Sequence, residues 1–168
     1  MSHVFIKLIT KTLFALTIGI AISSLVYAHG DKKHKDEAME FDAVETDFGS
    51  YQPDLEPTQT IEISMADTMR FSPAMLSVKS GDAVKFIVSN EGALQHEFVL
   101  GTPDSLAEHA DLMIKFPNME HEEPYMAHVD PGKEMEIVWQ FTEVGSFEFG
   151  CLLPGHFQAG MKGTITVE

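Results

Sequence analysis

From about Thr60 onward, hydrophobic and polar residues alternate along the chain with a period of two, the pattern of half-buried β-strands. The inward-facing sets are Leu76 and Val78; Val84, Phe86 and Val88; His96, Phe98 and Leu100; Ile137, Trp139 and Phe141; Phe147, Phe149 and Cys151; and Ile165 and Val167. Glycine, proline and asparagine separate these segments. Short strands with such breaks predict an all-β fold, an antiparallel β-sandwich.

One segment departs from this alternation. Leu106, Ala110 and Met113 recur with helical spacing within residues 105–116, and an irregular stretch follows as far as Gly132. We therefore expect a helix-and-loop insertion over residues 102–134. The β-domain as a whole, residues 59–168, is long enough for one hydrophobic core but not for two.

The N-terminal part has a different composition. Lys7 and Lys11 precede an apolar run, and Val26-Tyr27-Ala28 offers small residues for cleavage, so residues 1–28 are predicted to be a signal peptide. The alternative is an uncleaved membrane anchor, but the run is short for a span of about 20 residues. Residues 29–58 carry many acids and few apolar side chains, which predicts a flexible acidic tail. The protein is thus expected to be exported to the periplasm.

Charge restricts the partners. The chain carries a formal net charge of −15, and removal of the leader, with its two lysines and no acids, changes this to −17. Such a surface repels nucleic acid and anionic lipid. We therefore expect no nucleic-acid partner and no stable membrane insertion after cleavage.

Cys151 is the only cysteine, and a single thiol in an exported protein needs an explanation such as metal ligation. His156 follows five residues after it and Met161 five residues later, and Pro154-Gly155 and Gly160 allow the segment between them to fold back. Inward-facing His96 is the best candidate for a fourth ligand. A thiolate, two imidazoles and a weak thioether form a trigonal copper set, whereas zinc prefers further Cys, His or carboxylate ligands.

The C-x4-H-x4-M loop and its Phe-x-Phe-x-Cys lead-in resemble the cupredoxins, the family of plastocyanin, azurin and periplasmic copper-tolerance proteins. The resemblance implies a Greek-key sandwich and a type 1 site for one copper ion, Cu(I)/Cu(II), with His96, Cys151 and His156 as strong ligands and Met161 axial. Asn90 resembles the asparagine that ties the family's two ligand loops together. Two features differ from the family: azurin-like loops have one residue fewer before the methionine, and the 102–134 insertion is longer than in small electron carriers.

Two functions follow from this resemblance. The first is single-electron transfer with a redox partner protein. The alternative is copper handling, in which the protein binds, oxidises or buffers copper and exchanges it with a donor or acceptor protein. The residues that favour handling, as potential ligands of a second copper, are His109, Met113, Met119, His121, Met126 and His128 in the insertion, and His29 and His34 in the tail. Copper enzymes of this family need more paired histidines, and because the sequence contains no His-x-His pair we expect no enzymatic activity.

Overall fold

The computed structural model describes residues 40–117, 119 and 121–168. The predicted signal peptide and the tail up to residue 39, with His29 and His34, lie outside these residues. No helix within the described part of the chain is both long and apolar enough to span a bilayer.

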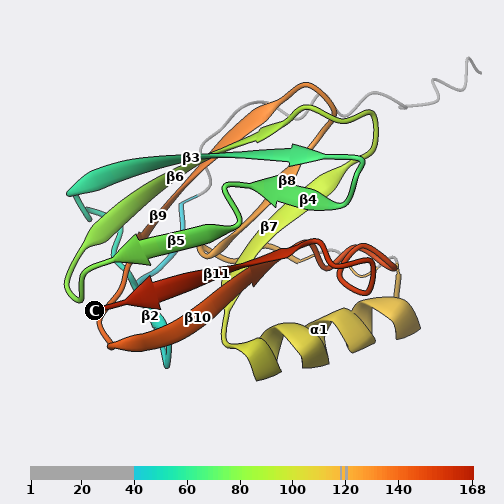
Figure 1. The fold of residues 1–168 in the computed structure, drawn as a ribbon. Helices are drawn as coiled ribbons and strands as arrows, with labels where there is room; N and C mark the ends of the chain where they lie inside the picture. The colour runs from blue at the N-terminus through green and yellow to red at the C-terminus, as the bar shows by residue number, and fades with distance from the viewer. Residues whose placement is uncertain (1–39, 118, 120) are drawn as a thin grey trace, which may run out of the picture. The chain divides into compact units, whose positions relative to one another are not determined.

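Two β-sheets form the domain (Figure 1). The strands of the first sheet are, in spatial order, β1 (Val44–Thr46), β2 (Gly49–Tyr51), β9 (Glu134–Gln140), β6 (Ala83–Asn90), β3 (Gln59–Ala66) and β4 (Arg70–Ser72). Those of the second are β5 (Met75–Val78), β11 (Lys162–Val167), β10 (Gly145–Gly150), β7 (His96–Gly101) and β8 (Met126–Val129). The predicted β-sandwich is confirmed. Its pairing is mixed rather than wholly antiparallel, because β3 pairs with β6 and β5 with β11 in parallel.

The hydrophobic core lies between the sheets and is rich in aromatic rings. Phe86, Phe98 and Phe149 are fully buried and stand with neighbouring ring centroids 5.2 Å apart. The predicted inward-facing residues are buried, apart from Leu76, which is only partly covered. The period of two therefore identified the core face of each predicted strand.

Strand β7 is buried on both faces, which its alternating pattern did not predict. The predicted helix is present as α1 (Pro103–Lys115), begun by a capping box between Thr102 and Ser105, and it packs against β7 and β10. Its buried side chains form a second apolar cluster with Val99, Met126 and Leu152. The insertion thus covers the outer face of β7 and buries it in a second apolar cluster.

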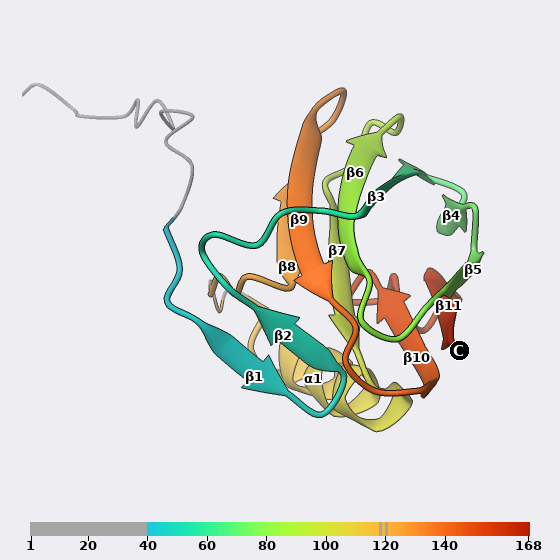
Figure 2. The ribbon, with the colours of Figure 1, turned by 90° about the vertical axis from the view of Figure 1, so that its left-hand side faces the viewer.

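Two ordered segments lie where loop or tail was expected. Strand β8 falls inside the predicted 102–134 loop region, where pairing with β7 satisfies its backbone. Residues 44–51, part of the predicted flexible tail, form the β1–β2 hairpin, and β2 joins the sheet beside β9 (Figure 2). Phe48, in the turn of this hairpin, stacks on Trp139 and its carbonyl accepts the indole N–H at 3.2 Å. Burial of Phe48, packing of Val44 and Tyr51 against the core and pairing with β9 together order this polar segment.

Candidate metal centre

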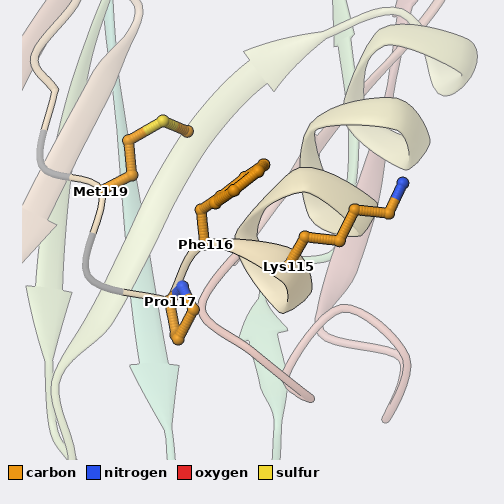
Figure 3. Close-up of a pocket in the computed structure, with 4 residues that line it drawn as sticks. All are labelled: Lys115, Phe116, Pro117 and Met119. Atoms are coloured by element: carbon orange, nitrogen blue, oxygen red, sulfur yellow. The ribbon is translucent and has the colours of Figure 1, made fainter.

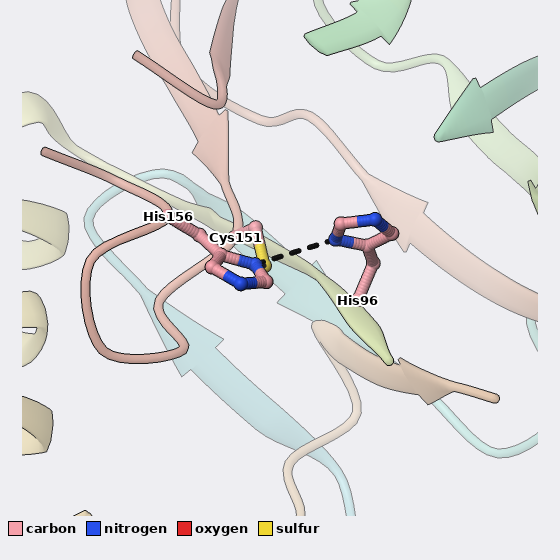
Figure 4. A group of neighbouring side chains, drawn as sticks. All are labelled: His96, Cys151 and His156. Atoms are coloured by element: carbon pink, nitrogen blue, oxygen red, sulfur yellow. Dashed lines mark hydrogen bonds between the residues drawn. The ribbon is translucent and has the colours of Figure 1, made fainter. Parts of the chain in front are cut away.

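Three of the four predicted ligands meet at one point (Figure 4). His96 begins β7, Cys151 directly follows β10, and His156 lies in the segment that leads to β11. The Nδ1 atom of His156 lies 3.2 Å from the Cys151 sulfur and 3.3 Å from Nδ1 of His96. One donor atom from each residue lies within 4.8 Å of the other two.

Backbone hydrogen bonds close the segment from Cys151 to Met161, which we call the ligand loop. The Cys151 N–H donates to the Met161 carbonyl at 3.0 Å, and the Met161 N–H donates to the His156 carbonyl at 3.1 Å. Gly155 and Gly160 adopt left-handed φ angles of 91° and 92°, which glycine tolerates without steric cost. The fold-back predicted from these glycines is present.

Met161 is fully buried and belongs to the same core cluster as Cys151. The hydrogen bonds of the ligand loop hold the first and last of its predicted ligands together at the backbone. The axial role of the Met161 thioether stays a prediction.

Asp67 orients His96, a contact that no sequence pattern predicted. Its Oδ1 atom lies 3.2 Å from His96 Nε2, so the carboxylate accepts that ring proton and leaves Nδ1 free as a donor to a metal. The backbone N–H groups of Ala93 and Leu94 donate to Asp67 and lower the pKa of its carboxyl. Asp67 is therefore ionised and held in place at neutral pH.

The Cys151 thiol lies in a dry environment. Burial raises its pKa to about 12, and the nearby Glu97 carboxylate acts in the same direction. The Glu97 backbone N–H opposes this shift, because it donates to the sulfur at 3.3 Å. Without a cation the residue is a thiol, and a metal must displace its proton in order to bind.

His156 is the only one of the four predicted ligands that is partly exposed. Burial lowers its pKa, and the neighbouring His96 ring adds to the effect. The imidazole is therefore neutral and available as a ligand at neutral pH. It is also the ligand through which the centre is most accessible from outside.

Asn90 does not bridge the two ligand segments, contrary to what the resemblance implied. Its side-chain amide donates to the carbonyls of Leu94 and Val129, each at 2.8 Å, and so braces the turn before His96 against β8. Glu97 makes the link instead, because its Oε2 accepts the Leu152 N–H at 3.2 Å. A buried glutamate one residue after His96 went unnoticed because that face of β7 was expected to meet solvent.

The donor set fits copper. Two imidazole nitrogens and one sulfur around a common ion, with bonds of about 2.0 to 2.3 Å, stand roughly 3.5 Å apart in trigonal geometry. His156 Nδ1 lies 3.2 Å from the Cys151 sulfur and 3.3 Å from His96 Nδ1, both close to this value. Phe98 and Phe149 are buried and belong to the same apolar cluster as Cys151, as expected for a centre with restricted solvent access.

The other candidate ligands lie apart from this centre. Met113 and Met126 pack in the apolar cluster under α1. Met119 lines an open hollow at the end of α1 with Lys115, Phe116 and Pro117, which supply no imidazole, thiolate or carboxylate (Figure 3). The His109 and His121 rings lie beside each other, and His128 contacts both the His121 carbonyl and the Glu97 carboxylate.

Comparison with known proteins agrees with this geometry. Residues 58–168 match the model of copper-binding proteins of the plastocyanin/azurin family. The chain is 47% identical to the copper-resistant cuproprotein CopI of Rubrivivax gelatinosus, over 74% of this chain and 75% of that protein. It is 33% identical to CopI of Pseudomonas aeruginosa, over 72% and 82%.

A solved structure shares the fold. Reduced auracyanin from Roseiflexus castenholzii superimposes with a TM-score of 0.58 at 22% identity, over 67% of this chain and 99% of that one. The family match covers well over half of the chain and includes every residue of the candidate centre. The chain therefore belongs to the plastocyanin/azurin family of copper-binding proteins, the cupredoxins.

Proposed function

We propose that this cupredoxin is a periplasmic copper-tolerance protein that holds one copper ion at His96, Cys151, His156 and Met161. The observation that carries the proposal is the convergence of two imidazoles on the only thiol of an exported-type chain. Similarity to two copper-resistant cuproproteins supports tolerance over a pure carrier role. Export to the periplasm rests on the signal-peptide pattern of residues 1–28.

The residues of the centre have distinct tasks in this proposal. Copper bound there supplies a one-electron couple, Cu(I)/Cu(II). Asp67 fixes the tautomer of His96, Cys151 gives up its proton and contributes its thiolate, and the N–H of Glu97 stabilises the charge on the sulfur. The buried position of His96 and Cys151 limits rearrangement between the two oxidation states.

A dedicated electron carrier is the second candidate. The partial exposure of His156 favours it, because an exposed ligand gives electrons a short path to a redox partner protein. In either role we propose that the protein acts stoichiometrically, without enzymatic turnover, and exchanges electrons or copper with another protein. A copper-handling protein differs from an electron carrier because it binds more than one copper ion.

The first test is a Cu(II) titration of residues 29–168, read by visible absorption and bound-metal analysis. An intense thiolate-to-copper band that saturates at one equivalent supports the centre, and further copper beyond that equivalent favours handling. The absence of any band would refute the ligand assignment. Cys151→Ser is the matched control, expected to lose the band and keep the fold.

Tolerance itself is tested in cells. A strain that lacks this gene should be sensitive to copper and be rescued by the wild-type gene but not by the Cys151→Ser variant. Rescue by Cys151→Ser would show that the thiolate centre does not provide tolerance. If the deleted strain grows normally on copper and the protein exchanges electrons rapidly with a partner protein, the electron-carrier function is supported instead.

A further inference from the structure

A second group of metal-binding side chains lies on the face of β7 opposite to the His96 side chain. Glu97 on β7 pairs directly with His128 on β8, so their side chains share that face. His109 comes from α1 and His121 from the segment between α1 and β8. Three of the described histidines and one carboxylate thus gather outside the copper centre.

The contacts within this group are close. The rings of His109 and His121 stand with centroids 4.7 Å apart. His128 Nε2 lies 3.2 Å from the His121 carbonyl, and its Nδ1 lies 3.0 Å from Glu97 Oε1. His128 therefore holds both the His121 backbone and the Glu97 carboxylate in position.

The polar atoms of the group are not satisfied by the protein. Both ring nitrogens of His121 are shielded from solvent and have no hydrogen-bond partner among the described residues. Glu97, only 2% exposed, has His128 as an ion-pair contact at 3.0 Å from Oε1, but this oxygen accepts no hydrogen bond of regular geometry. Burying polar atoms without a partner destabilises the fold, and a bound ion is one way to remove that cost.

The chemistry of the group suits a borderline divalent cation. Imidazole nitrogens and a carboxylate are ligands of Cu(II) and Zn(II), and the Glu97 charge would balance part of the charge of the ion. Among the described residues only the copper centre has three such donor atoms within 4.8 Å of one another. This second group must therefore close by side-chain rotation, and the half-buried ring of His109 on α1 is the one that would have to move.

We propose that His109 and His121 bind a second divalent cation of the Cu(II) or Zn(II) class, with Glu97 as the balancing carboxylate and His128 as a positioning residue. This site goes beyond the proposed function and does not depend on it. It provides capacity for metal in addition to the copper held by Cys151.

Glu97 couples this second site to the first. Its backbone N–H donates to the Cys151 sulfur, and its Oε2 atom accepts the Leu152 N–H. A cation drawn toward Oε1 changes the field at the sulfur. Zn(II) added to the Cu(II)-loaded wild-type chain is therefore expected to shift the thiolate-to-copper band, and not to shift it in the His109→Gln variant.

The test uses the full chain carrying Cys151→Ser, so that the first site is lost. Cu(II) binding is measured by equilibrium dialysis and by electron paramagnetic resonance, where imidazole ligands give nitrogen hyperfine structure. His109→Gln is expected to weaken one binding event on the order of tenfold or more, and the His109→Gln/His121→Gln pair to abolish it. The matched control is Glu108→Gln on the same helix, which should change nothing.

A second control separates this site from the tail. His29→Ala/His34→Ala should leave the imidazole signal assigned to His109 and His121 intact. If the tail variant removes all bound Cu(II), or if His109→Gln leaves affinity and spectrum unchanged, the proposal is overturned. His109 is partly exposed, so its variant decides the question even if His121→Gln disturbs folding. Loss or retention of this second site does not remove the thiolate-to-copper band expected from Cys151 in the wild-type protein.

Discussion

Copper uptake by this protein should release the proton of Cys151, and its affinity should therefore depend steeply on pH. The thiol is fully buried, and that burial raises its pKa to about 12. Copper binds the thiolate, so every copper that enters must displace one proton. Raising the pH lowers this competition and tightens binding.

The magnitude follows from the pKa. At pH 7 a thiol with a pKa of about 12 is ionised in about one molecule in 10⁵, so deprotonation costs about 7 kcal/mol. A solvated thiol with a pKa near 8.5 costs only about 2 kcal/mol. His156 adds no slope above neutral pH, since burial lowers its pKa. Affinity for Cu(II) is therefore expected to rise about tenfold per pH unit between pH 7 and 9.

The assay is a competition titration against a chelator whose own pH dependence is known. Calorimetry in two buffers of different ionisation enthalpy counts the protons released, with one per copper expected. Affinity that does not change with pH, with no proton released, would refute the reasoning, because it would mean that the thiolate already exists in the apoprotein. Glu97→Gln provides an internal check. It removes a carboxylate charge that raises the pKa of Cys151, so the thiol of the metal-free variant should ionise at a lower pH, followed by the ultraviolet absorbance of the thiolate.

Three further substitutions test the axial ligand, the orientation of His96 and the packing of the core. Met161→Leu should retain copper but raise the reduction potential, measured by voltammetry, because a donor that favours Cu(II) is lost; an unchanged potential would argue against an axial Met161. Asp67→Asn should also raise the potential, because it removes a negative charge hydrogen-bonded to a ligand ring, and no change would mean that this contact is absent in solution. Gly163→Ala would drive a Cβ into the Phe149 ring, and such overpacking costs about 1 to 3 kcal/mol. The apoprotein should then melt several degrees lower by calorimetry, whereas an unchanged melting temperature would show that the strands move apart freely.

Much of the fold could be predicted because core strands leave a local signature. Phe147 and Phe149 on β10 and Cys151 directly after it share one parity, and the structure buries all three. The ligand loop could also be predicted, because its three candidate ligands lie within eleven residues and glycines mark its turns. His96 was placed correctly because its parity matches that of Phe98 and Leu100.

The features that were missed depend on contacts distant in sequence. Strand β8 is short and surrounded by acids, and only its pairing with β7 makes it a strand. Asp67 lies in the turn between β3 and β4 and resembles any surface aspartate until the chain brings it to His96. Glu97 occupies an outward position in its strand, and only the covering helix makes that position interior.

The position of β11 has a consequence for the order of assembly. This last strand of the chain does not lie at an edge but between β10 and β5, with β5 contributed by a segment from the first half of the sequence. Pairings so distant in sequence form late, because the loop entropy must be lost before the contacts form. The ligand loop immediately precedes β11, and both its ends are bonded to each other. The donor set is therefore held in its final arrangement only after β11 has paired with β10 and β5, so metal capture follows the assembly of the second sheet.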